Sequence, residues 1–182
     1  MSLSLVTNTI FLDTETQKLA DEVGGWHNVS RMGLAVAVTF STQEAAFRHF
    51  TEEQVADLIA ELLAADLVVG FNVLRFDYEV LRPYSSVDLS ELPTLDMLER
   101  IYHRLGFRVS LDSLARATLG TRKSADGIQA VRWYKEGRLD KVLAYCEKDV
   151  AVTRDLYEFG RRNKRLRFLD GHQRLQQVAV NW

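Results

Sequence analysis

The sequence predicts an α/β fold, with one mixed β-sheet flanked by helices. Three strand-like segments lie close together near the N-terminus, at residues 9–13, 29–40 and 45–50. The segments between them are too short for helical crossovers, so these strands are expected to pair antiparallel. A helical segment then leads to a fourth short apolar run at 67–71, and most of the remaining sequence has helical periodicity. Later strands are therefore expected to add in parallel, in a layered domain.

The elements of the first half each have their own signal. The first segment is apolar and ends at Asp13, and the second alternates and is rich in Val, Ala and Phe. Thr51 is suited to be the N-cap of the next helix, because Gln54 completes a capping box three residues later. That helix has one apolar face, formed by Val55, Leu58, Ile59, Leu62 and Leu63.

Glycines and prolines separate the elements of the second half. Pro83 ends one predicted helix, and Gly106, Gly120 and Gly137 each follow another. The elements expected here are, in order, a helix at 76–82, a strand at 94–96, helices at 97–105, 111–119, 124–135 and 139–161, and an edge strand at 166–169.

Length and composition indicate one soluble globular domain over residues 1–182. A chain of this length buries enough surface to fold without disulfides. Apolar residues make up 47% and charged residues 26%, which is ordinary for such a protein. Cys146 is the only cysteine, which fits a reducing cytoplasm. No apolar run is long enough to span a bilayer and no signal peptide is recognisable, so we expect a cytoplasmic protein without a membrane partner.

The net charge of −2 does not by itself indicate a nucleic-acid-binding protein. A set of carboxylates that holds cations would, however, count as negative until the cations bind. Five basic residues cluster near the C-terminus: Arg161, Arg162, Lys164, Arg165 and Arg167. They are either a solvated helix end, where cations are favoured, or a phosphate-contacting patch.

Two carboxylates follow the first apolar strand. Asp13 and Glu15 are two residues apart, so on a strand they point to the same face. Like charges at close range raise each other's pKa, and a divalent cation removes that penalty. The alternative is an ordinary turn after a strand, where such residues are common.

Two further segments carry acidic residues. Asn72 and Asp77 follow the fourth strand, where they could equally begin a helix. Tyr145 and Asp149 are four apart in the longest helix, which places both on one face. There a tyrosine hydroxyl beside a metal-bound carboxylate can orient an attacking water, unless the pair is only a half-buried tyrosine next to a solvated aspartate.

Other candidates are weaker. Asp96 follows a predicted strand and is either a helix cap or a carboxylate that supports the site. Trp26 either packs within its loop or contacts substrate. The four histidines show no zinc-binding spacing; they are His27, His49, His103 and His172.

The three segments together also resemble a known family. Asp-x-Glu after an apolar strand, then Asn-x4-Asp, then Tyr-x3-Asp is similar to the three motifs of the DEDD 3′–5′ exonucleases, which are ribonuclease H-like (DnaQ-like) proteins. The tyrosine is typical of the DEDDy branch. The resemblance covers about residues 5–160. Residues 71–77 resemble the second motif of family B DNA polymerase proofreading domains and of YprB-like stand-alone domains, and the compact size favours the latter.

The resemblance implies a ribonuclease H-like fold and a site for two Mg²⁺ or Mn²⁺ ions. Asp13, Glu15 and Asp149 would hold one ion. Asp13 would also bridge to the second ion, assisted by Asp77. Carboxylate oxygens are the ligands that these hard cations prefer.

The same resemblance implies hydrolysis of DNA or RNA from a free 3′ end, with release of nucleoside 5′-monophosphates. Tyr145 would orient the nucleophilic water. Asn72 and the backbone around Thr14 would seat the terminal nucleotide. A single-stranded substrate is expected, and a helicase or polymerase is a plausible partner.

Two other functions remain open at this stage. The first is a non-catalytic nucleic-acid-binding or scaffolding module, because a fold does not determine a function. The second is a ribonuclease H-like endonuclease that acts on RNA–DNA hybrids. The sequence does not distinguish DNA from RNA, or DNA repair from proofreading or RNA turnover.

Overall fold

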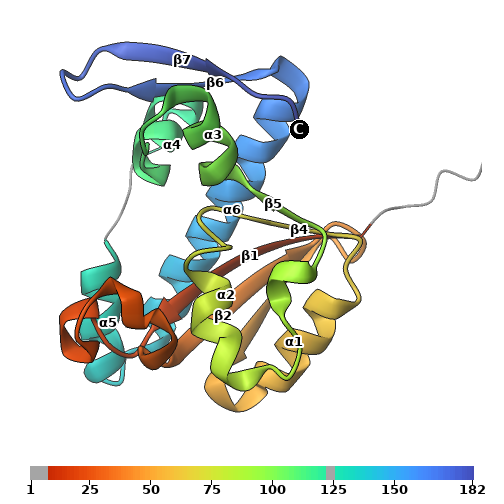
Figure 1. Cartoon of the computed structure of the whole chain (residues 1–182), viewed down its shortest axis with the longest axis vertical. Coiled ribbons are helices and arrows are strands. Elements are labelled where there is room, and N and C mark those ends of the chain that lie inside the picture. The colour runs from red at the N-terminus through yellow and green to blue at the C-terminus, as the bar shows by residue number, and fades with distance from the viewer. Residues whose placement is uncertain (1–7, 122–125) are drawn as a thin grey trace, which may run out of the picture.

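A five-stranded mixed sheet forms the centre of the protein (Figure 1). The computed structural model describes residues 8–121 and 126–182. The strand order is β3-β2-β1-β4-β5. The strands are β1 (Thr9–Thr16), β2 (Leu34–Ser41), β3 (Ala46–Thr51), β4 (Leu67–Gly70) and β5 (Thr94–Asp96). The first three pair antiparallel, whereas β4 and β5 add in parallel, so the predicted mixed sheet is confirmed.

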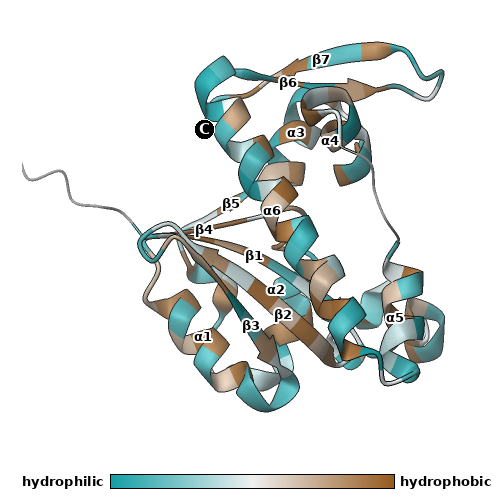
Figure 2. Cartoon of the chain, turned by 180° about the vertical axis from the view of Figure 1, so that it is seen from behind, coloured by the Kyte–Doolittle hydropathy of each residue, from teal (hydrophilic) through white to brown (hydrophobic). Residues whose placement is uncertain are grey.

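Helices cover both faces of this sheet. The α-helices of the described chain are α1 (Val55–Leu63), α2 (Asp77–Leu81), α3 (Met97–Leu105), α4 (Leu111–Leu119), α5 (Gly127–Lys135) and α6 (Leu139–Asn163). The α1 and α2 helices lie on one face, and the long α6 helix crosses the other (Figure 1). The central strands are largely hydrophobic, while the outward sides of the helices carry hydrophilic residues (Figure 2). Within the described part of the chain, no helix is long and apolar enough to cross a membrane.

The alternation of side chains along β1 divides the core into two clusters. Ile10 and Leu12 point to the cluster under α1 and α2. Phe11 points to the cluster under α6, where it meets Tyr157 edge-on. Because side chains alternate along a strand, positions 13 and 15 share the face of Phe11, and position 14 shares the face of Leu12. The end of β1 therefore presents carboxylates to α6 and a threonine to α2.

Side-chain caps and glycines set the boundaries of α3 and α4, which agree with the predicted ranges. Asp96, Ser110 and Asp126 cap the starts of α3, α4 and α5 by accepting backbone N–H groups. Gly106 and Gly120 follow α3 and α4 in the left-handed conformation that ends a helix.

Three predicted elements differ from the structure. The strand predicted at 29–40 begins only at Leu34, because Trp26–Arg31 forms a 3₁₀ helix and Gly33 then turns the chain at a positive φ of 72°. The helix predicted to begin at residue 124 starts at Gly127, and residues 124–125 lie outside the described chain. The helix predicted at 76–82 is short, and a 3₁₀ turn containing Pro83 follows it.

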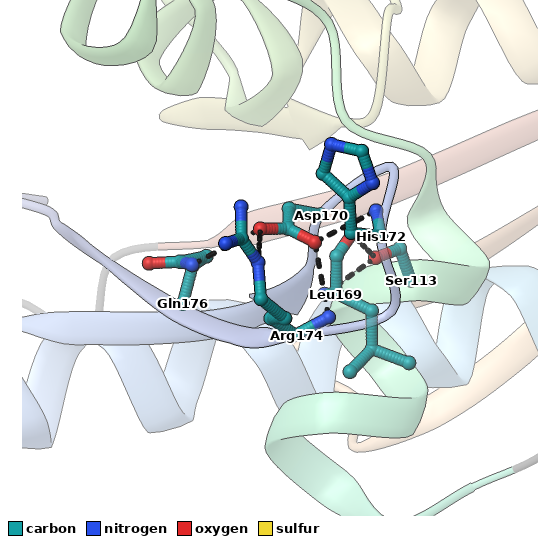
Figure 3. Close-up of polar contacts among 6 residues, drawn as sticks. All are labelled: Ser113, Leu169, Asp170, His172, Arg174 and Gln176. Carbon is teal, nitrogen blue, oxygen red and sulfur yellow. Dashed lines mark hydrogen bonds and ion pairs between the residues drawn. The ribbon is translucent and has the colours of Figure 1, made fainter.

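The C-terminal strand was also placed incorrectly. The segment predicted as an edge strand is β6 (Arg165–Leu169), which pairs with β7 (Leu175–Ala179) in a separate hairpin and not with the main sheet. The turn is fixed by Asp170, whose carboxylate accepts the backbone N–H groups of His172 and Arg174 and the side chains of Arg174 and Gln176 (Figure 3). These donors hold the pKa of Asp170 at about 2.

Two hydroxyl groups on α4 attach this hairpin to the domain. Ser113 donates to the carbonyl of Leu169 and accepts from its N–H, at 3.1 and 2.9 Å (Figure 3). Thr118 bonds the backbone of Arg167 in the same two ways, at 2.8 and 2.9 Å. The edge of β6 that does not pair with β7 is thus hydrogen-bonded to α4, which holds the hairpin and α4 together.

Candidate metal centre

Three of the predicted carboxylates meet between β1 and α6. One oxygen each of Asp13, Glu15 and Asp149 lies within 4.8 Å of the others. Glu15 is buried, whereas Asp13 and Asp149 are partly exposed. Hard divalent cations bind oxygen at about 2.1–2.6 Å, so oxygens on opposite sides of one ion lie up to about 5 Å apart. The three carboxylates therefore fit around one hard cation.

The charges in this cluster oppose one another. The pKa of Asp13 is raised well above its ordinary value, first by burial and then by the charges of Asp77, Asp149 and Glu15. A positive ion at the centre would remove this repulsion. An all-oxygen donor set suits hard cations such as Mg²⁺, Ca²⁺ or Mn²⁺ better than softer metals.

Asp77 lies beside this group but does not belong to the three-residue cluster. It begins α2, on the face of β1 opposite to α6, and it is 2% exposed. The Thr14 hydroxyl donates to its Oδ1 at 2.8 Å. Burial, more than any other cause, raises the pKa of Asp77 to about 7. Asp77 is nevertheless the charge that raises the pKa of Asp13 most, so the two carboxylates are electrostatically linked.

Tyr145 is buried one helical turn before Asp149. Its ring meets Trp133 of α5 edge-on, with ring centres 6.4 Å apart. The pKa of Tyr145 is raised, mainly by burial, then by the charges of Asp149, Glu15 and Asp13, and by a hydrogen bond with Asp149. Its hydroxyl therefore stays protonated at neutral pH. Tyr145 and Asp149 thus both face the carboxylate cluster. The alternative interpretation, a half-buried tyrosine beside a solvated aspartate, does not describe this pair.

Cys146 is a member of the site that the sequence reasoning did not identify. Its buried thiol lies 3.2 Å from the carbonyl oxygen of Asp13 and 3.3 Å from Oδ2. Burial is the main cause that raises the pKa of this thiol, so the sulfur remains a hydrogen-bond donor. The sequence does contain a signal for this role, because Cys146 lies three residues before Asp149 and therefore shares its helix face.

Asn72 and Asp96 organise the loop between β4 and α2. Asn72 has a left-handed backbone with a φ of 70°, and its N–H donates to Asp96 Oδ1 at 2.9 Å. The Asp96 carboxylate also accepts from Leu74 N and Leu98 N, so it both caps α3 and holds this loop. The side-chain oxygen of Asn72 accepts from Arg108 at 3.0 Å. Asn72 does not cap α2; it shapes the loop that leads to Asp77.

A hollow of about 420 Å³ opens beside the carboxylate cluster. Asp13, Thr14 and Glu15 line one side of it. Its walls include Trp26, Phe76 and Ile128, with the Trp26 and Phe76 ring centres 6.4 Å apart. Trp26 is 72% exposed, so it does not pack inside its loop.

The basic C-terminal cluster lies elsewhere. Arg161 pairs with Glu158, and Arg162 donates to the carbonyl of Glu158. Arg161 lies twelve positions after Asp149 in α6, which is a rise of about 18 Å along a helix. These contacts favour the interpretation as a solvated helix end.

A mixed sheet of order β3-β2-β1-β4-β5, with carboxylates at the end of β1 and on a helix that crosses its face, defines a ribonuclease H-like protein. The chain belongs to the RNase H superfamily, whose family model matches residues 10–159. A search of the curated proteins found no match.

Among solved structures, the chain is similar to the family B DNA polymerase from the hyperthermophilic archaeon Pyrobaculum calidifontis. The TM-score is 0.64 at 14% sequence identity, and the similarity covers 85% of this chain and 24% of the polymerase. The chain thus spans about a quarter of that polymerase. At this level of identity the similarity demonstrates a common fold.

Proposed function

We propose that this protein is a metal-dependent 3′–5′ exonuclease of the DEDDy type, which releases nucleoside 5′-monophosphates from DNA or RNA. The convergence of Asp13, Glu15 and Asp149, with the Tyr145 hydroxyl bonded to Asp149, carries this proposal. Membership of the RNase H superfamily supports a nucleic-acid substrate. The spacing of the third motif supports the DEDDy branch.

The residues divide the chemistry among themselves. Asp13, Glu15 and Asp149 would hold a Mg²⁺ or Mn²⁺ ion, and Asp13 with Asp77 would help to hold a second. Such ions lower the pKa of water and stabilise a leaving oxygen. Tyr145 keeps its proton and can hold a water next to Asp149. Cys146 keeps the Asp13 side chain in place.

The hollow beside the cluster supports the choice of a nucleotide as the group that binds. Its volume of about 420 Å³ is of the size that small-molecule sites have. The exposed Trp26 and the adjoining Phe76 offer aromatic faces on which a nucleobase can stack. Thr14 is among the residues that line this hollow, whereas Asn72 lines a different hollow, with Arg75 and Arg108.

The test uses 5′-labelled single-stranded DNA and RNA with Mn²⁺. We expect a ladder of shortened products and release of 5′-monophosphates, and no cutting of a circular single strand. Asp13→Asn and Asp149→Asn should abolish digestion while circular dichroism shows an intact fold. Asp140→Asn, an exposed aspartate on the same helix as Asp149, is the matched control and should stay active.

Metal binding provides a readout that does not depend on turnover. Mn²⁺ should raise the melting temperature of the wild type and of Asp140→Asn, but not of Asp13→Asn, because a ligand stabilises the state that binds it. Digestion by both cluster variants would contradict the metal assignment. Cutting of the circular strand would identify an endonuclease, and an absence of any Mn²⁺ effect would favour a non-catalytic module.

A further inference from the structure

Two contiguous hollows lie on the far side of the 72–76 loop from the candidate metal centre. The first, of about 210 Å³, is lined by Arg75, Tyr102, His103 and Arg108 among others. The second, of about 320 Å³, lies between the 107–110 segment, α4 and the turn of the β6–β7 hairpin. Arg108 lines both hollows, so they form one continuous surface.

This surface adjoins the carboxylate cluster from two directions. Arg75 lines the first hollow, and the next residue, Phe76, lines the hollow that contains Asp13. Asp112 lines the second hollow and also a small depression that contains Asp149. A nucleic-acid strand that extends from the metal centre can therefore continue directly onto this surface.

Exposed aromatic side chains mark this surface. Tyr102 is 45% exposed and Phe107 is 49% exposed, one in each hollow, and Arg108 lies in both. Aromatic faces interleaved with cationic side chains are the pattern that binds single-stranded nucleic acid, because bases stack on the rings while phosphates meet the cations. A purely apolar patch would instead suggest a protein partner.

The charges of the surface are consistent with a polyanion. Among the described residues, some exposed arginines pair with a carboxylate, as Arg116 does with Asp112 and Arg174 with Asp170. Arg75 and Arg108 are exposed and have no carboxylate partner within 4 Å in the described chain. Of the acidic side chains that line the first hollow, Asp96 is buried under backbone N–H groups, whereas Glu99 is exposed.

We propose that Arg75, Tyr102, Phe107 and Arg108 bind the single strand upstream of the 3′-terminal nucleotide. This inference rests on the proposed exonuclease, whose terminal nucleotide would occupy the hollow at Asp13. The surface determines affinity for long strands, whereas the metal centre and its own hollow act on the terminal residue.

Binding and hydrolysis test this surface separately. Tyr102→Ala and Arg75→Ala should each weaken binding of a labelled twenty-nucleotide oligothymidylate by roughly fivefold or more, measured by fluorescence anisotropy in EDTA. Tyr102→Phe should restore the affinity, because the ring is kept. Arg75→Ala should also reduce the slope of log affinity against log salt by about 0.7. Arg162→Ala, in the basic cluster at the end of α6, is the matched control and should bind like the wild type.

Hydrolysis separates this inference from the proposed function. Relative to the wild type, the same variants should have a higher KM for the long strand. Their KM for the p-nitrophenyl ester of thymidine 5′-monophosphate should rise less, because this substrate has no upstream strand. Wild-type affinity in Tyr102→Ala and Arg75→Ala, or equal losses on both substrates, would overturn the inference. If the protein hydrolyses no strand but its DNA affinity still depends on Tyr102, the proposed exonuclease activity is refuted and the strand-binding surface is supported. No binding of any strand by the wild type would refute the surface.

Discussion

The buried thiol of Cys146 on α6 is hydrogen-bonded to Asp13 on β1, with the sulfur 3.3 Å from Oδ2 and 3.2 Å from the backbone carbonyl. This contact joins the helix that carries Asp149 to the strand that carries the other two carboxylates of the cluster. It also lowers the pKa of Asp13 in opposition to burial and to the neighbouring charges. Cys146 therefore favours the charged form of Asp13 that a cation requires.

Replacing Cys146 by alanine removes this donor. The pKa of Asp13 should rise further, and Mn²⁺ affinity should fall by about tenfold near neutral pH, as is common for residues that support a metal ligand. The Cys146→Ser variant keeps a donor and should lie closer to the wild type. Isothermal titration with Mn²⁺ at several pH values measures the effect. Equal Mn²⁺ affinity in the alanine variant and the wild type would contradict a positioning role.

Asp77 should make the metal-free protein less stable as pH rises. Its pKa is about 7 in the folded protein, against roughly 3.9 in an unfolded chain. Between these values the folded protein keeps a proton that the unfolded chain has released. The free energy of unfolding should therefore fall with rising pH, by up to about 1.4 kcal/mol per pH unit for this group.

Asp77→Asn removes that titration and should flatten the profile. The measurement is urea unfolding in EDTA between about pH 4 and 7. Some slope should remain in the variant, because the pKa of Asp13 is raised in the same direction. Parallel profiles for the variant and the wild type would mean that Asp77 is ionised in the folded state.

Tyr145→Phe keeps the ring against Trp133 but loses the hydroxyl. We expect kcat to fall by roughly 10- to 100-fold with little change in KM, because the loss affects the orientation of water and not the binding of substrate. The loss should be smaller than in Asp13→Asn. Steady-state kinetics on a labelled oligonucleotide measure it, and a fully active variant would remove Tyr145 from the mechanism.

Gly70→Ala should disturb the loop that leads to Asp77. A Cβ at this position would lie 2.6 Å from the Cβ of Val73, which is fully buried. The clash should cost about 1–3 kcal/mol of stability and displace the loop. Gly171→Ala is the matched control, because nothing lies within 4 Å of its added Cβ and its φ is not positive. Thermal unfolding compares the two, and equal melting temperatures would show that the loop adapts.

The mixed sheet and most helices could be predicted because local signals specify them. The short connection between β2 and β3 requires antiparallel pairing, and a glycine in the left-handed conformation follows α3 and α4. The β6–β7 hairpin was harder to predict. Its second strand, β7, is exposed apart from Val178, and the outer edge of β6 is hydrogen-bonded by Ser113 and Thr118 of α4.

The candidate site was predicted in part for a similar reason. The periodicity of a strand and of a helix places Asp13, Glu15 and Asp149 on facing surfaces, and the structure brings them together. The position of Asp77 on the opposite face of β1, reached through Thr14, depends on tertiary packing. The thiol contact of Cys146 and the exposure of Trp26 depend on it too.

The division of β1 between two faces has a consequence for how this protein tolerates changes in length. Deleting or inserting one residue before Asp13 would exchange the occupants of the two faces, so that a threonine faced α6 and the acidic pair faced α2. A sheet could still form from such a chain, but the carboxylates of Asp13 and Glu15 would no longer meet Asp149. Single-residue indels should therefore be excluded from this segment.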